Sequence, residues 1–192
     1  MEWLNDLKEK YSRRRIRNLD RTKEYPRDFV DLESARKVGL IINVGQHSEG
    51  DLTQILNYAQ ALLKRGKNLF VIELNFDKKS ESQLSKRFPK VTFINPSKLN
   101  WLEYPTPQIE QEVQAVELDI LLDFDDSEHM TSRYLCSMAR AKTRTGVHRE
   151  GFESCYELMI TREEATEVKT MIKEFDYFLN MIDNGKKEKV QS

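Results

Sequence analysis

The chain has 192 residues, of which 39% are hydrophobic and 33% are charged, and its formal net charge is −1 at pH 7. This length suits one domain with one core, the several apolar runs argue against wholesale disorder, and the balanced charge argues against a globally basic nucleic-acid binder. Two cysteines cannot build a disulfide framework, and neither a secretory signal nor an apolar run of about 20 residues is visible, so we expect a cytoplasmic protein.

Residues 1–28 predict a basic amphipathic helix. Its apolar side chains recur at the three- and four-residue spacing of one helical stripe: Trp3, Leu4, Leu7 and Tyr11. The stretch "KEKYSRRRIR" (8–17) holds six basic residues against one acid. We favour a helix whose apolar stripe packs on the body or contacts a protein partner; the alternative is contact with a nucleic acid or a membrane surface. The candidate partner-binding residues are Arg13, Arg14, Arg15 and Arg17.

Strand and helix patterns alternate through residues 29–183. Strands are predicted at 37–44, 68–76, 90–96, 118–124, 143–148 and 155–160. Helices are predicted at 52–66, 80–88, 107–117, 127–142 and 161–182, the last with a capping box of Thr161 and Glu164. This order indicates an α/β fold: a single three-layer Rossmann-like domain with a mostly parallel sheet of about six strands, ordered 3-2-1-4-5-6. Residues 184–192 are predicted to be a flexible polar tail.

The carboxyl ends of the first and fourth strands should share one edge of such a sheet, where open parallel sheets bind ligands. We expect the loops 44–51 and 124–130 to meet there. The ligand-binding candidates are Asn43, Gln46, Ser48, Asp123, Asp126 and His148; the catalytic candidates are Asp51, Asp125 and His129. Neighbouring carboxylates raise one another's pKa, as a general base requires. The alternative is that the acids cap the next helix and that the histidines are solvated surface groups.

Other chemistries find no support in the motifs. "GQHSEG" is not a phosphate-binding loop, so no nucleotide cofactor is predicted. Cys136 and Cys155 lie among apolar residues and are expected to be packed core groups, not nucleophiles. The acids and His129 lack a diagnostic ligand spacing, so no metal is predicted.

Two resemblances bear on these expectations. "LESARKVGLIINV", "LLKRGK" and "LDILLDFDD…MARAKTRTGVH" resemble an uncharacterised family, a domain of unknown function found chiefly in Bacteroidota. More distantly, residues 37–150 resemble the acceptor half of heptosyltransferase-like glycosyltransferases, through Gly50-Asp51, "DILLDF" and "YLCSMARAKTRTGVH". That resemblance implies that Asp51 is the base that activates an acceptor hydroxyl. Such enzymes hold the nucleotide sugar in a second domain, which this chain is not expected to contain.

We therefore favour a non-catalytic binding or interaction module without a cofactor. One alternative is a reduced glycosyltransferase-like enzyme, or a sugar or nucleotide binder, that uses Asp51 with Asp125 or His129. The other alternative is association with RNA or a membrane surface through residues 1–28.

Overall fold

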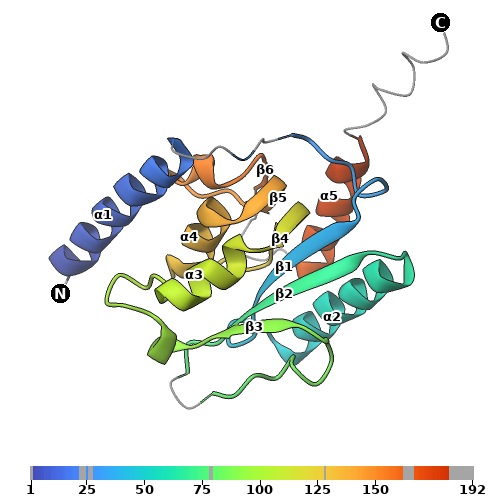
Figure 1. The fold of residues 1–192 in the computed structure, drawn as a ribbon, viewed down its shortest axis with the longest axis horizontal. Helices are drawn as coiled ribbons and strands as arrows, with labels where there is room; N and C mark the ends of the chain where they lie inside the picture. The colour runs from blue at the N-terminus through green and yellow to red at the C-terminus, as the bar shows by residue number, and fades with distance from the viewer. Residues whose placement is uncertain are drawn as a thin grey trace, which may run out of the picture.

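A sheet of six parallel strands forms the centre of the molecule (Figure 1). The computed structural model describes residues 2–21, 25, 28–77, 80–127, 129–161 and 167–181, and within α1 the side chains of residues 9–19 only. The strands are β1 (Lys37–Asn43), β2 (Asn68–Leu74), β3 (Val91–Ile94), β4 (Glu117–Asp123), β5 (Arg140–Val147) and β6 (Leu158–Ile160). Their order is β3-β2-β1-β4-β5-β6. The predicted fold class and strand order are thus confirmed.

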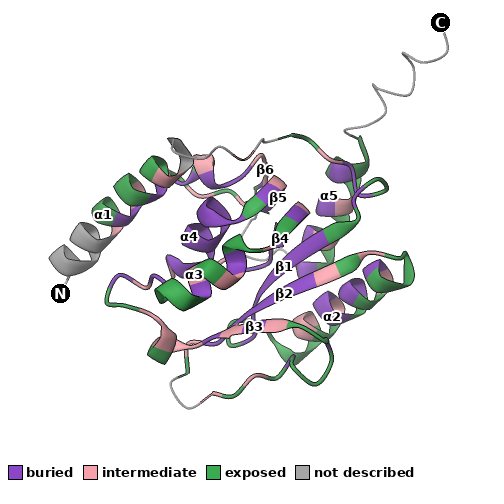
Figure 2. Cartoon of the chain, in the orientation of Figure 1, coloured by how far each residue is buried: buried purple, intermediate pink, exposed green. Residues whose placement is uncertain are grey.

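The two central strands are almost entirely buried (Figure 2). In β1 every residue after Lys37 is buried, and β4 is buried from Ile120 to its end. Continuous apolar runs of this kind are typical of parallel strands that are covered on both faces. Because β1 pairs with β4, Ile41 lies beside Asp123 and the two strands end at the same edge of the sheet.

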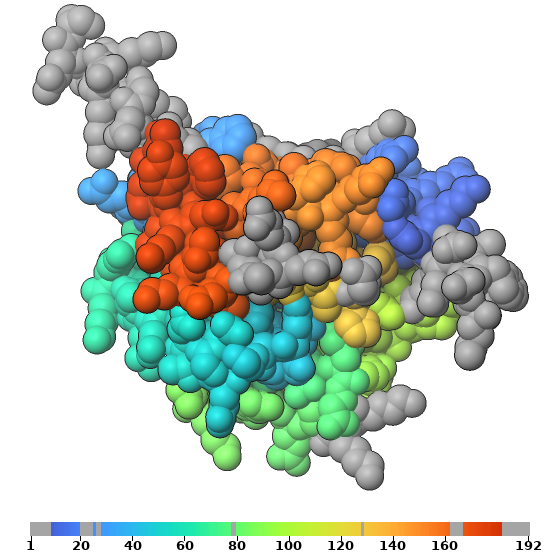
Figure 3. All heavy atoms as spheres, turned by 180° about the vertical axis from the view of Figure 1, so that it is seen from behind, coloured from blue at the N-terminus to red at the C-terminus, as the bar shows by residue number. Residues whose placement is uncertain are grey.

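Helices cover both faces of the sheet. They are α1 (Glu2–Arg21), α2 (Glu49–Lys64), α3 (Pro107–Gln114), α4 (Thr131–Met138) and α5 (Val168–Met181), with short 3₁₀ turns η1 (Pro96–Lys98) and η2 (Glu153–Cys155). One apolar core joins the sheet to α1, α3 and α4, and a second joins it to α2 and α5. From behind, α5 lies beside α2 (Figure 3), where Tyr58 donates a hydrogen bond to Asp176.

The short helix predicted at 80–88 is absent, and this segment forms turns instead. Its backbone is held by the carboxylate of Glu73, which is fully buried in β2. That carboxylate accepts hydrogen bonds from the amides of Gln83 (2.8 Å) and Leu84 (3.1 Å) and from the hydroxyl of Ser82 (2.6 Å). These amides bind a side chain of another element, so they do not enter a helical ladder.

Three other predicted boundaries were wrong. The helix expected at 127–142 is α4, which ends at Met138 because Arg140 already pairs with Glu117 in the sheet. The last strand begins only at Leu158, after η2. The closing helix is described from Val168; Thr161 is not helical, and its capping partner Glu164 lies outside the described residues.

The first helix packs on the body, and Tyr11 is the one residue of the predicted stripe whose side chain is described. Ser12 and Ile16 are buried, whereas Tyr11 is 61% exposed, so its expected packing was wrong. The side chains of Trp3, Leu4 and Leu7 lie outside the described residues. Contacts with Phe152 and Tyr134 are made instead by arginines, as described below, because guanidinium groups stack well on aromatic rings. No helix in the described parts of the chain combines the length and apolarity that a membrane crossing requires.

Candidate functional site

The loops that follow β1 and β4 meet at the carboxyl edge of the sheet. The ring Nε2 of His47, in the first loop, lies 3.1 Å from the carbonyl oxygen of Phe124, at the start of the second. The amide of Phe124 in turn donates to the carbonyl of Ile41 in β1. The predicted strand order therefore brings these two polar loops together, at the position where open parallel sheets hold ligands.

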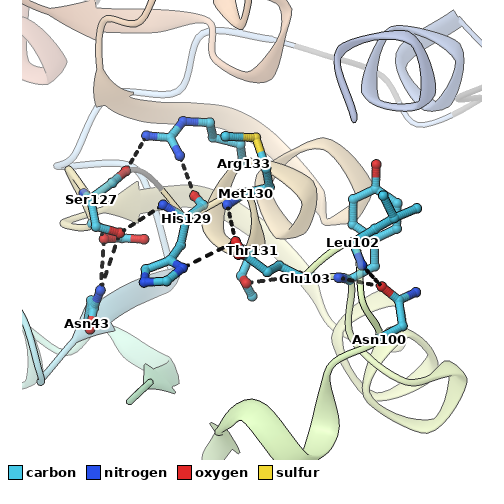
Figure 4. A network of polar contacts seen from close by, with 11 residues as sticks. Asn43, Asn100, Leu102, Glu103, Ser127, His129, Met130, Thr131 and Arg133 are labelled. Carbon is cyan, nitrogen blue, oxygen red and sulfur yellow. Dashed lines mark hydrogen bonds and ion pairs between the residues drawn. The ribbon is translucent and has the colours of Figure 1, made fainter. Parts of the chain in front are cut away.

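Asn43, labelled in Figure 4, and its hydrogen-bond partner Asp125 form the centre of this edge. Both residues are 2% exposed. The Asn43 amide donates to Asp125 Oδ1 at 3.1 Å, and that oxygen also accepts from the amide of Ser127 at 3.0 Å. The other oxygens, Asn43 Oδ1 and Asp125 Oδ2, are buried and have no hydrogen-bond partner among the described residues. Few buried polar atoms in proteins lack a partner, and those that do are often bonded to a water molecule or a ligand. We refer to Asn43, Asp123, Asp125 and Ser127 as the carboxyl-edge cluster.

Asp123 lies beneath this pair and is fully buried. Its Oδ2 accepts hydrogen bonds from the Tyr156 hydroxyl at 2.7 Å and, weakly, from the Cys136 thiol at 3.6 Å, and its Oδ1 accepts from the Asp125 amide at 2.9 Å. Burial and the charge of Asp125 raise the pKa of Asp123 to about 7. The cluster therefore holds one carboxyl group whose pKa lies near neutral, chiefly because it is buried and secondarily because Asp125 is close.

Arginines hold the second loop in place through its carbonyl groups. Arg133 is 2% exposed; it donates to the carbonyl of Ser127 at 2.7 Å and to that of His129. Arg149 donates to the carbonyl of Asp126. In these contacts both guanidinium groups bind backbone carbonyl groups. The contacts hold the loop in place, and they are not ion pairs with the carboxylates of the cluster.

A neighbouring network, also shown in Figure 4, connects the loop to residues 99–106. The carboxylate of Glu103 accepts from the amide of Met130 at 3.0 Å and lies 3.2 Å from His129 Nδ1. The His129 ring stacks on Phe76, with centroids 3.6 Å apart. Glu103 has a φ of 63°, a left-handed conformation that is uncommon for residues other than glycine. These contacts could not be predicted from the sequence, because no motif links Glu103 to His129.

The remaining candidates lie around the cluster. Ser48 and Asp51 form a capping box for α2: Ser48 Oγ accepts from the Asp51 amide at 3.1 Å and donates to its carboxylate at 2.8 Å. Gln46 is exposed. His148, after β5, is exposed and lies 3.8 Å from the Glu153 carboxylate. Helix capping accounts for the position of Asp51, and its role as a base stays a prediction.

Gly45 lies directly beside the cluster. It is exposed, and a Cβ atom placed on it would lie 3.4 Å from Asn75 Oδ1 and 3.7 Å from Asn43 Oδ1. Gly45 therefore borders the unpartnered oxygen of Asn43 from the solvent side. A larger side chain at this position would stand over the cluster without entering the core.

The candidate arginines of α1 divide into two pairs. Arg13 lies over the Phe152 ring, 5.2 Å from its centroid, and Arg15 donates to the Tyr134 hydroxyl at 3.3 Å. Arg14 and Arg17 are exposed on the outer side of the helix. Among the described side chains of α1, Arg14, Arg17 and the exposed Lys10 face outward and form no such contact with the described part of the body.

Thiol and metal chemistry have no basis in the described residues. Cys136 and Cys155 are free and fully buried, and burial raises the pKa of both thiols, which keeps them in the unreactive protonated form. Within the ranges that the structure describes, no three histidine, cysteine, aspartate or glutamate side chains gather in a way that could hold a metal ion.

Comparison with known proteins gives a family and a fold likeness. No curated protein matches the chain. Among solved structures it is similar to E. coli heptosyltransferase WaaC with ADP (13% identity, TM-score 0.47, 76% of this chain and 46% of that one) and to the same enzyme with ADP-2-deoxy-2-fluoro heptose (12%, 0.47, 76% and 47%). The chain thus spans about half the length of these structures. The model of a family of unknown function, DUF6913, matches residues 8–182, so the chain belongs to that family.

Proposed function

We propose that this chain is a binding module that takes a small polar ligand at the carboxyl edge, between the ends of β1 and β4. The observation that carries the proposal is the pair of unpartnered buried oxygens, Asn43 Oδ1 and Asp125 Oδ2. A buried polar group without a partner costs about 1–3 kcal/mol, so a ligand that donates hydrogen bonds there would recover that free energy on binding.

The chemistry of the two oxygens limits the ligand class. Both atoms are acceptors, so the ligand must present O–H or N–H groups, as sugars, polyols and amines do. The carboxylate of Asp125 already accepts two hydrogen bonds and that of Asp51 accepts one from its capping partner. These commitments support binding rather than proton abstraction. Free, buried cysteines support a reducing setting such as the cytoplasm.

Chemical-shift mapping of backbone amides would test the proposal. Sugars, polyols and small amines are added to the labelled protein, and we expect shifts confined to residues 43–47 and 124–130. Gly45→Leu should abolish these shifts, because its side chain would stand over the cluster, while Gly50→Leu, also exposed but in the first turn of α2, should leave them intact. Binding that Gly45→Leu leaves unchanged, or shifts confined to other surfaces, would exclude this site.

The outer face of α1 supports a second candidate function. Lys10, Arg14 and Arg17 are exposed at a spacing of four and three residues, which places them on one stripe of the helix. We propose that this stripe contacts an anionic partner. The charge-reversed variant Arg14→Glu/Arg17→Glu should weaken binding to RNA, and binding by the unaltered protein should fall steeply with salt. Salt-insensitive binding would contradict an electrostatic contact.

A further inference from the structure

We infer that the ligand of the carboxyl-edge cluster carries a positively charged amino group. This inference rests on the proposed function and narrows it from any hydrogen-bond donor to a cation. Its basis is an imbalance of charge: two carboxyl groups are buried together, and the groups that bind them are neutral.

The donors to these carboxyl groups can be followed one by one. Asp123 receives the Tyr156 hydroxyl, the Cys136 thiol and a backbone amide. Asp125 receives the Asn43 amide and the backbone amide of Ser127. Within the described residues, neither carboxylate forms an ion pair. Isolated buried charges are costly, and buried carboxylates are usually paired with a cation.

The nearby buried arginines are committed to other groups. Arg133 donates to the carbonyls of Ser127 and His129 and lies over the Phe152 ring, 5.6 Å from its centroid. Arg144 forms a bidentate pair with Glu157. These contacts do not bond either arginine to the carboxylates of the cluster. A ligand would therefore supply the cation that bonds to them directly.

An ammonium group matches the vacant acceptors better than a hydroxyl group does. Asn43 Oδ1 and Asp125 Oδ2 belong to side chains in direct contact, and each lacks one donor. An ammonium group has three N–H donors, whereas a hydroxyl group has one. One amino group can thus supply donors to both side chains and also offset the carboxylate charge. A neutral polyol needs two hydroxyl groups to supply the two donors, and it does not offset the charge.

Binding of a cation would also change the protonation of the cluster. Asp123 has a pKa of about 7, so it is partly protonated at neutral pH. An adjacent positive charge lowers the pKa of a carboxyl group. A cationic ligand should therefore release protons when it binds near pH 7, whereas a neutral ligand should not.

Matched pairs of probes test the inference: ethanolamine against ethylene glycol, and glucosamine against N-acetylglucosamine, at a pH at which the amines are protonated. Calorimetry in buffers of different ionisation enthalpy measures affinity and proton release, and amide shifts locate the site. We expect the ammonium member of at least one pair to bind ten-fold or more tightly than its neutral partner, with proton release. Asp125→Asn should remove that preference, while Glu117→Gln, at the exposed opposite end of β4, should keep it.

The outcomes separate the two proposals. If both members of each pair bind equally well and Gly45→Leu blocks both, the site takes neutral donors; the inference is then overturned and the proposed function stands. If no probe shifts residues 43–47 or 124–130, both proposals are overturned. An ammonium preference that survives in Asp125→Asn would place the cation elsewhere and would also overturn the inference.

Discussion

Two sets of buried charged side chains along the sheet have opposite kinds of partner. In β5, Arg144 is 1% exposed, and its guanidinium donates to both carboxylate oxygens of Glu157, at 3.0 and 2.6 Å, and to the Cys136 carbonyl at 2.9 Å. At the carboxyl edge, Asp123 and Asp125 are as deeply buried, and their hydrogen-bond donors among the described residues are neutral. In the first set each charge is paired with an opposite charge, and in the second set the described residues provide no such pairing.

Glu73 shows that neutral donors alone can provide all the hydrogen bonds that a buried carboxylate in this fold needs. Its two oxygens accept from one hydroxyl and two amides, and no oxygen of its side chain is left unpartnered. The vacant Oδ2 of Asp125 is therefore not a general property of acids at this sheet. The satisfied buried charges support the fold, and the unsatisfied acceptors at the carboxyl edge are the basis of the proposed ligand site.

The strongest test of this contrast is Glu157→Gln. It leaves the buried guanidinium of Arg144 without a counter-charge, and breaking a buried pair in this way costs about 3–5 kcal/mol of unfolding free energy. Urea denaturation at pH 7 measures the loss. Glu117→Gln is the matched control, because its partner Arg140 is 46% exposed and an exposed pair contributes about 1 kcal/mol or less. Equal losses in the two variants would refute the distinction.

The pH dependence of stability is the second test. The pKa of Asp123 is about 7 in the folded protein and near 3.8 when unfolded, so between these values the folded state binds more protons. Stability should therefore fall as pH rises from about 4 to 7 and then level off, by on the order of 4 kcal/mol from this group. Denaturation of the unaltered protein and of Asp123→Asn at several pH values isolates the effect. A variant that follows the same pH profile would contradict it.

Asp125→Asn should change stability in the opposite direction from Glu157→Gln. The substitution removes an unpaired buried charge and its repulsion of Asp123, while Oδ1 can still accept from Asn43 and Ser127. We expect a gain of about 1 kcal/mol at pH 8, above the pKa of Asp123 in the unaltered protein, and a smaller gain at pH 5, below it. Urea denaturation at both pH values provides the check. A loss as large as that of Glu157→Gln would mean that the Asp125 charge supports the fold.

The sheet could be predicted from the sequence because its signals are local. Continuous apolar runs mark β1 and β4, and alternation with helices fixes parallel strands and their order. Long-range contacts produced the errors. The turns at 80–88 depend on the buried carboxylate of Glu73, and α4 stops early because Arg140 pairs with Glu117.

The candidate site, like the fold, could be predicted from the sequence only where the signals are local. Asn43 and Asp125 could be placed at one edge because Asn43 lies at the end of one recognisable strand and Asp125 follows another. Three other features could not be predicted. They are the unpartnered oxygens, the hydrogen bond that Tyr156 donates to Asp123, 33 residues away in the sequence, and the contact between Glu103 and His129. These features depend on rotamers, on close packing and on one left-handed residue, and none of them has a sequence motif.

The smallest expected effects separate a structural role of Asp51 from a catalytic one. Ser48→Ala removes the cap of α2 and should cost about 1 kcal/mol of unfolding free energy. Asp51→Asn keeps an acceptor for Ser48 but loses a negative charge in the first turn, which should cost about 0.5 kcal/mol. Thermal and urea denaturation measure both losses. If Asp51 only caps the helix, the ligand-induced chemical shifts at residues 124–130 should be nearly the same in both variants as in the unaltered protein. Loss of binding in Asp51→Asn alone would instead show that its carboxylate belongs to the ligand site, because Ser48→Ala disturbs the same helix end more strongly.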